Sequence, residues 1–318
     1  MSLCLYRSGT RKHPGDTYDT FGIHLGACES QEIAIATDEN TAETIEVPER
    51  YAREIQARER LHEACPVDVY VAGINPRYSW PNRLVAANEA RPSVADSADS
   101  VIVDSVVNDP YYAVEDVLDA AHELDAEYVV GKDWPPESDP AGEGVHAADA
   151  YEWFLGEYTS HECEADVIVP IAPPFDAGSL NCLSQVDHFA LGGMRDMSGE
   201  QQVAHIRNFR EVAGYDVDVH GLGVGTSTEL IGAIRESVET DPEKPLLDSF
   251  DISTPENAVS KGKLPDKSWQ QHRVSFPTGE DSTTVRAGFA ESIARMLEYE
   301  LSPGCDDEIL RNAGFATF

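Results

Sequence analysis

Four aspartates lie at or near the ends of short apolar runs, where a carboxylate can react. They are Asp104 in SVIVD (100–104), Asp133 in EYVVGKD (127–133), and Asp248 and Asp251 in LLDSFD (246–251). A buried carboxylate is costly unless it is paired or hydrogen-bonded, so such acids belong at the open ends of strands or at helix N-caps. Asp251 precedes ISTP rather than a helical pattern, which favours a reactive role. One carboxylate can capture an electrophilic carbon while a second moves protons.

Two glycine-containing turns follow other apolar runs. VDHFALGG (186–193) ends on Gly192 and Gly193, and HGLGVGT (220–226) contains Gly223 and Gly225. The second turn lacks both the G-x-G-x-x-G pattern and the P-loop lysine, so a tight strand-to-helix turn is favoured over a phosphate site. His188 and His220 fall within the runs and are expected in the core or in the wall of a site, not at a metal.

The apolar runs alternate with amphipathic segments, which is typical of a parallel sheet built from βαβ units. The seven runs are 67–73, 100–104, 127–133, 166–171, 186–193, 217–223 and 246–251. In YAVEDVLDAAHEL (112–124) the apolar residues share one helical face. Ser198 with Gln201, and Thr226 with Glu229, have the spacing of capping boxes. These features predict an α/β fold, a (β/α)8 TIM barrel whose active site lies at the C-terminal ends of the strands.

The predicted eighth strand is poorly marked, because residues 262–284 read mostly as loop. We expect three parts: an N-terminal segment (1–60), a barrel (61–302) and a C-terminal tail (303–318). In the N-terminal segment, FGIHLGA (21–27) and EIAIAT (32–37) are candidates for a β-hairpin that caps the barrel.

The composition is strongly acidic. The 318 residues include 58 Asp and Glu against 23 Lys and Arg, giving a formal charge of −35. The acids are dispersed, which favours the cytoplasm of a halophilic cell. At about 1 M salt the Debye length is only about 3 Å, so this charge does not exclude nucleic acid as a partner. No apolar run is long enough to predict a membrane span, and the six cysteines form no C-x-x-C pair, so neither zinc nor a disulfide scaffold is expected.

Three motifs resemble the signatures of the guanine transglycosylases, in the same order and spacing. They are FALGGM (189–194), VHGLGVGTSTELIGAI (219–234) and LLDSFDISTP (246–255). Upstream, IVDS (102–105) is similar to the start of the family's DSGGFQ, and VVGKDWPP (129–136) looks like its strand that ends in an acid. The resemblance spans roughly residues 67–260. It implies a (β/α)8 barrel that exchanges guanine in a polynucleotide for a free 7-deazaguanine base such as preQ0, without a cofactor.

The resemblance also implies roles for individual residues. Asp251 would be the nucleophile and Asp104 the second acid. Asp133 would bind the N1–H and 2-amino group of the base. The remaining base-binding candidates are Gly192, Gly193, Met194 and Asp248, followed by Trp134, Gly223, Gly225 and Asp96. Trp134, Trp269 or Tyr111 would stack on a base that has been flipped out of a duplex or taken from a single strand.

The departures from the family pattern point to a divergent branch. DSGGFQ is replaced by DSVVND (104–109), the loop that usually ends in VQG reads PIAPP (170–174), and Glu256-Asn257 replace a threonine-arginine pair. The C-terminal zinc-site cysteines of the tRNA-modifying members are absent. These features resemble the phage and archaeal-virus enzymes that place 7-deazaguanines in DNA. DNA is therefore the favoured substrate. A tRNA-modifying enzyme, a catalytically inactive nucleic-acid-binding barrel and a carboxylate-dependent glycosidase are the alternatives.

Overall fold

The computed structural model describes two compact units of the chain. The described residues are 33–37, 44–48, 57–58, 60–73, 80–95, 98–106, 112–132, 145–175, 180–265, 269, 271–273 and 282–302. The first unit comprises Met1–Pro66, Arg77–Trp80 and Thr254–Phe318, and the second comprises Val67–Pro76 and Pro81–Ser253. The predicted boundaries at residues 60 and 302 differ from these divisions, and they stay a prediction about the protein's domains.

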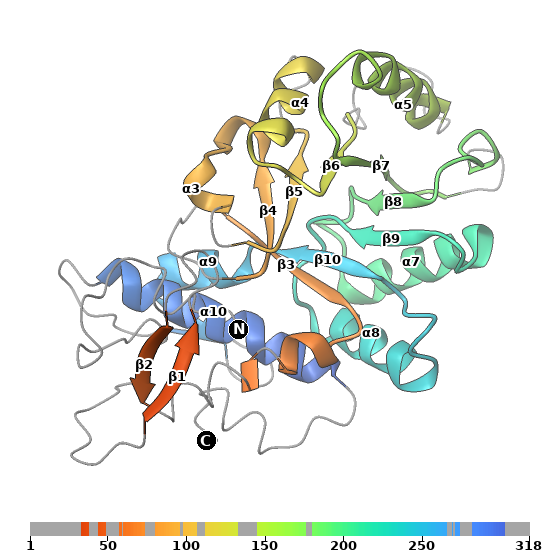
Figure 1. The fold of residues 1–318 in the computed structure, drawn as a ribbon. Coiled ribbons are helices and arrows are strands. Elements are labelled where there is room, and N and C mark those ends of the chain that lie inside the picture. Colours follow the sequence, from red (N-terminus) through yellow and green to blue (C-terminus); the bar gives the residue numbers. More distant parts are fainter. Residues whose placement is uncertain are drawn as a thin grey trace. The chain divides into compact units, whose positions relative to one another are not determined.

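The second unit contains a closed barrel of eight parallel strands. They are β3 (Asp68–Ala72), β4 (Asn82–Ala86), β5 (Ser100–Asp104), β6 (Tyr128–Val130), β7 (Asp166–Ile171), β8 (His188–Leu191), β9 (Asp218–Gly221) and β10 (Ser249–Ile252). They neighbour one another in chain order, and β10 closes the barrel by pairing with β3. Helices lie on the outside of these strands (Figure 1). The predicted parallel α/β barrel is thereby confirmed.

The eighth strand is β4, which the sequence analysis missed. Its sequence, NRLVA, begins with two polar residues, so it does not read as an apolar run. Arg83 is nevertheless completely buried, and its Nη2 donates to the carbonyl oxygen of Gly73 at 2.8 Å. The sequence pattern predicts that the Arg83 side chain is exposed to solvent. In the fold it is buried, and a backbone carbonyl oxygen accepts a hydrogen bond from one of its donors.

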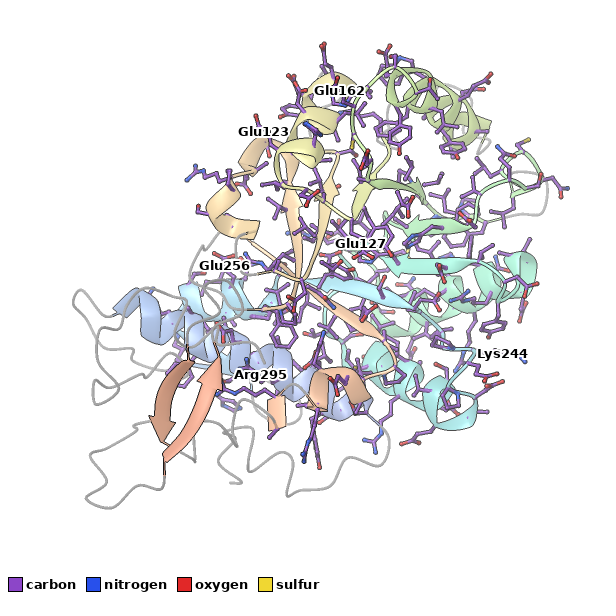
Figure 2. The ribbon with its side chains drawn as sticks, viewed as in Figure 1. Glu123, Glu127, Glu162, Lys244, Glu256 and Arg295 are labelled. Carbon is purple, nitrogen blue, oxygen red and sulfur yellow. The ribbon has the colours of Figure 1, made fainter. Side chains whose placement is uncertain are left out.

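The helices of the barrel unit follow its strands. They are α3 (Pro92–Ala95), α4 (Val114–Glu123), α5 (Val145–Tyr158), α7 (Gly199–Ala213) and α8 (Thr228–Thr240), with the short 3-10 helix η1 (Ala87–Glu89) after β4. The predicted apolar face of α4 is confirmed, because Val117 and Leu118 are fully buried in the core between this helix and the sheet. Glu123 and Glu162 are exposed and extend from the outer edge of the unit beside α4 (Figure 2).

Helix capping explains where α7 and α8 begin. The predicted capping box of α7 is confirmed: Ser198 Oγ accepts from Gln201 N, and the Gln201 side chain accepts from Ser198 N. The prediction for α8 was wrong by one residue. Ser227, not Thr226, is the N-cap, and its Oγ accepts from Leu230 N at 3.2 Å. The extended backbone of Ser227 puts its hydroxyl within reach of that amide.

The first unit contains two small sheets and, on the described residues, helical segments. β1 (Ile33–Thr37) pairs antiparallel with β2 (Thr44–Pro48), and β11 (Lys263–Pro265) pairs antiparallel with β12 (Gln271–Arg273). The helices with assigned bounds are α9 (Thr254–Ser260) and α10 (Ser282–Leu301). Residues 21–27, the other predicted arm of the N-terminal hairpin, and the predicted tail 303–318 lie outside the described residues. Among the described helices, none combines the length and apolarity needed to cross a membrane.

Candidate active site

The interior of the barrel is defined by side chains that pack together from six different strands. They are Tyr70, Leu84, Ile102, Val130, Ile168 and Ala190. Side chains alternate between the two faces of a strand, so residues two positions apart point the same way. Asp104 follows Ile102 by two residues at the end of β5, so the strand directs its side chain inward at the C-terminal end of the barrel.

Asp251 is a buried carboxylate with its two oxygens in different surroundings. It lies in β10 and is only 5% exposed. Its Oδ1 accepts a hydrogen bond from the backbone N–H of Gly223 at 2.5 Å and lies 3.6 Å from Nε2 of His220. Oδ2 has no hydrogen-bond partner among the described residues. A carboxylate with one oxygen anchored and the other open is suited to nucleophilic attack.

His220 lies directly beside this carboxylate. It is fully buried in β9, and its Nδ1 is 2.8 Å from Oγ of Ser249, the residue that pairs with it across to β10. Its ring meets Tyr70 edge to face, with 5.7 Å between ring centroids. The sequence pattern predicts His220 in the core or in the wall of a site, and it indicates no partner for the side chain. The alternation of side chains along β9 was the signal in the sequence that could have placed His220 inside the barrel. Its contact with Asp251, however, depends on the pairing of β9 with β10.

Burial shifts the pKa of three further side chains in the barrel strands, so that each of the three is uncharged at neutral pH. The pKa of His188 falls to about 4, because of burial first and of nearby His220 second, while Asp187 acts in the opposite direction. Burial is also the largest cause that raises the pKa of Tyr128 to about 12, and it raises the pKa of Tyr70 further still.

Asp248 and Asp251 lie on opposite faces of this extended segment of the chain. Its Oδ2 accepts from Nη2 of Arg210 at 2.6 Å and from the backbone N–H of Val219 at 2.7 Å. Arg210 belongs to α7, so Asp248 joins β10, β9 and a helix on the outside of the barrel. The predicted separation of the two aspartates onto opposite faces is confirmed. These contacts give Asp248 a structural role, and they do not support the base-binding role implied by the resemblance.

The turn after β8 contains three of the predicted base-binding residues. Gly193 is exposed with φ of 71°, and a Cβ added there would lie 3.0 Å from Cβ of Ala172. Gly192 is buried, and a Cβ there would make only ordinary contacts. Met194 is fully buried, so its side chain is part of the core. Gly193 is therefore the member of this turn whose backbone is open to a ligand.

Gln202 joins two of the turns at the C-terminal end of the barrel. Its Nε2 donates to the carbonyl oxygens of Met194 and Val224, both at 3.0 Å, and the residue is 3% exposed. The turns after β8 and β9 are thus held together by one buried amide from α7. The sequence analysis did not identify this residue, because a glutamine in a helix carries no local signal of such a contact.

The glycine-rich turn after β9 donates a backbone hydrogen bond to the Asp251 carboxylate. Gly223 and Gly225 have φ of 62° and 74°, a conformation that suits glycine. The favoured interpretation as a tight turn is consistent with these angles. In addition, the turn aims the Gly223 amide at Asp251, which the spacing alone did not predict.

The segment after Asp104 contains backbone strain. Val106 is buried and has φ of 58°, which is rare for a β-branched residue. It occupies the position of the first glycine in the DSGGFQ pattern, so a left-handed backbone is present here without the glycine. Lys132, a buried residue that the sequence analysis missed, donates from Nζ to the carbonyl oxygen of Ser105 at 3.3 Å and lies 5.9 Å from the centroid of the Tyr112 ring.

Several predicted site residues lie outside the described residues or in the other unit. Asp133, Trp134, Asp96 and Tyr111 are outside the described residues, and Trp269 belongs to the first unit. Within the described part of the chain, no group of three or more His, Cys, Asp or Glu residues could hold a metal ion.

A separate cavity of about 440 Å³ is present on the outside of the barrel unit. Its lining includes Arg210, Tyr215, Leu246 and Lys244, the last of which is labelled near α8 in Figure 2. Tyr215 and Leu246 precede β9 and β10, so the cavity lies at the N-terminal ends of these strands, away from Asp251. The Arg210 side chain is held by backbone carbonyls and Asp248, which gives this cavity a structural wall.

No protein-family model matches the chain, and no curated protein matches it significantly.

Proposed function

We propose that this protein is a transglycosylase that replaces guanine in a polynucleotide with a 7-deazaguanine base such as preQ0, through a covalent aspartyl-glycosyl intermediate. The observation that carries the proposal is the state of Asp251: a buried carboxylate in the barrel whose Oδ1 is anchored by a backbone amide and whose Oδ2 accepts no hydrogen bond from the described residues. The motif resemblance supplies the reaction class.

The reaction proceeds by two displacements at C1′ of the sugar. Asp251 Oδ2 forms a bond to C1′ while the bond from C1′ to N9 of guanine breaks, and the departing base takes the electron pair and a proton. The incoming base then loses the proton from N9 and attacks C1′, and the pair in the C1′–Oδ2 bond returns to the carboxylate. The oxocarbenium-like transition states gain from the nearby negative charge. Two inversions at one carbon give net retention.

The other residues have supporting roles in this proposal. Asp104 points inward at the same end of the barrel and is the candidate for proton transfer. The exposed backbone of Gly193 forms part of the wall against the base. Asp133, outside the described residues, stays the predicted partner of the base's N1–H and 2-amino group.

DNA is the favoured polynucleotide, and tRNA is the second candidate. The loss of the family's zinc-site cysteines supports DNA. The acidic composition supports a halophilic cytoplasm, and the resemblance to DNA-modifying viral enzymes supports a virus of such cells as the source.

The test is base exchange with radiolabelled guanine on single-stranded DNA, duplex DNA and unmodified tRNA in concentrated KCl. Wild-type protein is expected to exchange on DNA and to form a covalent adduct detectable by intact mass spectrometry. Asp251→Asn keeps the shape but removes the nucleophilic charge, so exchange should fall by about a thousandfold or more and the adduct should vanish. Glu236→Gln, at a position whose side chain is 73% exposed, is the matched control and should behave as wild type.

Three results would contradict the proposal or part of it. Exchange by Asp251→Asn at near the wild-type rate would refute the nucleophile. Exchange on tRNA alone would refute the DNA preference. Binding of nucleic acid by wild-type protein without exchange or adduct would favour the inactive binding barrel.

A further inference from the structure

A buried imidazole beside the candidate nucleophile has one nitrogen without a hydrogen bond. His220 is fully buried, and among the described residues its Nε2 has no hydrogen-bond partner within 3.5 Å. Nε2 lies 3.6 Å from Oδ1 of Asp251. Its other nitrogen, Nδ1, is satisfied by Ser249 Oγ at 2.8 Å. A buried polar atom left in this state is costly, so its position calls for a functional explanation.

The Asp251 carboxylate beside Nε2 favours one tautomer of His220, because the Ser249 hydroxyl can either donate to Nδ1 or accept from it. A neutral imidazole carries its proton on one nitrogen only. If Nδ1 carried it, the lone pair of Nε2 would face the Asp251 carboxylate, which is repulsive. If the Ser249 hydroxyl donates to Nδ1, the proton lies on Nε2 and points toward Oδ1. The second arrangement satisfies Ser249 and makes the contact with Asp251 attractive.

We propose that His220 is a positioning residue which, together with the Gly223 amide, holds Oδ1 of Asp251 so that Oδ2 faces the sugar. This inference rests on the proposed function. It adds two N–H donors, from His220 and Gly223, to Oδ1, the carboxylate oxygen of Asp251 that does not attack the sugar. The two donors come from neighbouring positions in the chain: His220 lies in β9 and Gly223 in the turn that follows it, while Ser249 and Asp251 lie two residues apart on one face of β10.

The donor pair acts on the second displacement. In the covalent ester, Oδ2 is bonded to C1′ and Oδ1 is the carbonyl oxygen. As the incoming base attacks and the C1′–Oδ2 bond breaks, negative charge returns to the carboxylate and is shared by Oδ1. Two N–H donors aimed at Oδ1 stabilise that charge, which makes Asp251 a better leaving group. His220 itself is fully buried, so it is not the group that exchanges protons with the bases.

Two amide substitutions separate positioning from packing. His220→Gln places an amide N–H near the former Nε2 and so keeps a donor toward Asp251. His220→Asn matches Nδ1 instead: it keeps a partner for Ser249 and removes the donor. Loss of one such donor lowers kcat by about 100- to 1000-fold when the hydrogen bond is short. Because the distance here is 3.6 Å, we expect a smaller loss, about 10- to 100-fold, for His220→Asn.

The substitutions are expected to affect the two chemical steps differently. His220→Asn should lower kcat and the KM for the polynucleotide together, and the covalent adduct should accumulate because its breakdown is slowed. His220→Gln should stay within about threefold of wild type. Equal losses in both variants without accumulation of adduct, or wild-type kcat in folded His220→Asn, would overturn the inference.

A measurement on the unaltered protein covers the case in which these variants do not fold. Nitrogen-15 NMR of histidine-labelled wild-type protein, with Ser249→Ala used for assignment, is expected to show His220 as the Nε2–H tautomer. The Nδ1–H tautomer in an active enzyme overturns this inference alone. Wild-type protein that neither exchanges guanine nor forms an Asp251-dependent adduct overturns the proposed function and, with it, the catalytic role of His220.

Discussion

Substitution of Asp248 by asparagine should destabilise the fold without impairing the chemistry. The Asp248 carboxylate accepts from Arg210 at 2.6 Å and from Val219 N at 2.7 Å. The Arg210 side chain is only 2% exposed, and its other donors go to the carbonyl oxygens of Leu246 and Val217, among others. Asp248→Asn removes the negative charge from this pair and leaves a guanidinium that is buried among neutral acceptors.

The magnitude follows from the burial of the two partners. Removing one partner of a fully buried ion pair costs about 3–5 kcal/mol, because the remaining charge is uncompensated. The Asp248 side chain is 33% exposed, so water screens part of this interaction. We therefore expect a loss of about 2–3 kcal/mol. At roughly 2–4 °C per kcal/mol for larger domains, the Tm should fall by about 4–12 °C.

The assay is denaturant and thermal unfolding of wild type and variants in concentrated KCl, with base exchange measured per folded molecule. Glu236→Gln is the control, since its pair with Arg207 is exposed and 3.4 Å long. A pair of this kind is worth less than about 1 kcal/mol, and screening by salt lowers that further. Exchange by folded Asp248→Asn should match wild type, because this carboxylate lies on the outer face.

Two outcomes would refute this reasoning. A loss of stability as small as that of Glu236→Gln would mean that the buried guanidinium does not depend on the charge of Asp248. A large loss of exchange by fully folded Asp248→Asn would mean that this residue acts in the site, as the motif resemblance first implied.

Two further substitutions test the site's surroundings. Gly193→Ala should lower the free energy of unfolding by about 1–2 kcal/mol, because φ is 71° and the new Cβ would meet Ala172 at 3.0 Å. Gly192→Ala should lower it clearly less. Equal losses measured by denaturant unfolding would contradict the assignment of strain to Gly193. His188 has a pKa of about 4 in the folded protein against 6.5 when unperturbed, so its contribution to stability is full above pH 6.5 and is lost progressively as the pH falls toward 4. The loss amounts to about 3 kcal/mol. In His188→Gln, the free energy of unfolding should depend less on pH between pH 6.5 and 4. An unchanged slope in this range would contradict the buried neutral imidazole.

Much of the fold was predictable because local patterns agree with the final structure. The apolar runs that became β5 and β7 have the same bounds as the strands. A parallel strand buried on both faces needs a continuous apolar run, so its sequence is informative by itself. β4 was not predictable in this way, because Asn82 and Arg83 are polar residues whose burial depends on distant partners.

The sequence by itself determined which side of β10 each aspartate occupies. The alternation of side chains along a strand places Asp248 and Asp251 on opposite faces wherever the strand lies, and the apolar runs around them require that strand to be buried. The motif resemblance then indicated Asp251 as the residue that reacts.

Only the tertiary structure decided what surrounds Asp251. The contacts with Gly223 and His220 arise because β9 and β10 pair in one register, with Ser249 opposite His220. No local pattern encodes this register, since it results from the closure of all eight strands into one barrel. A shift of one residue would turn His220 to the outer face and remove it from the carboxylate. The proposed nucleophile is therefore readable from the chain, whereas its anchoring depends on long-range pairing.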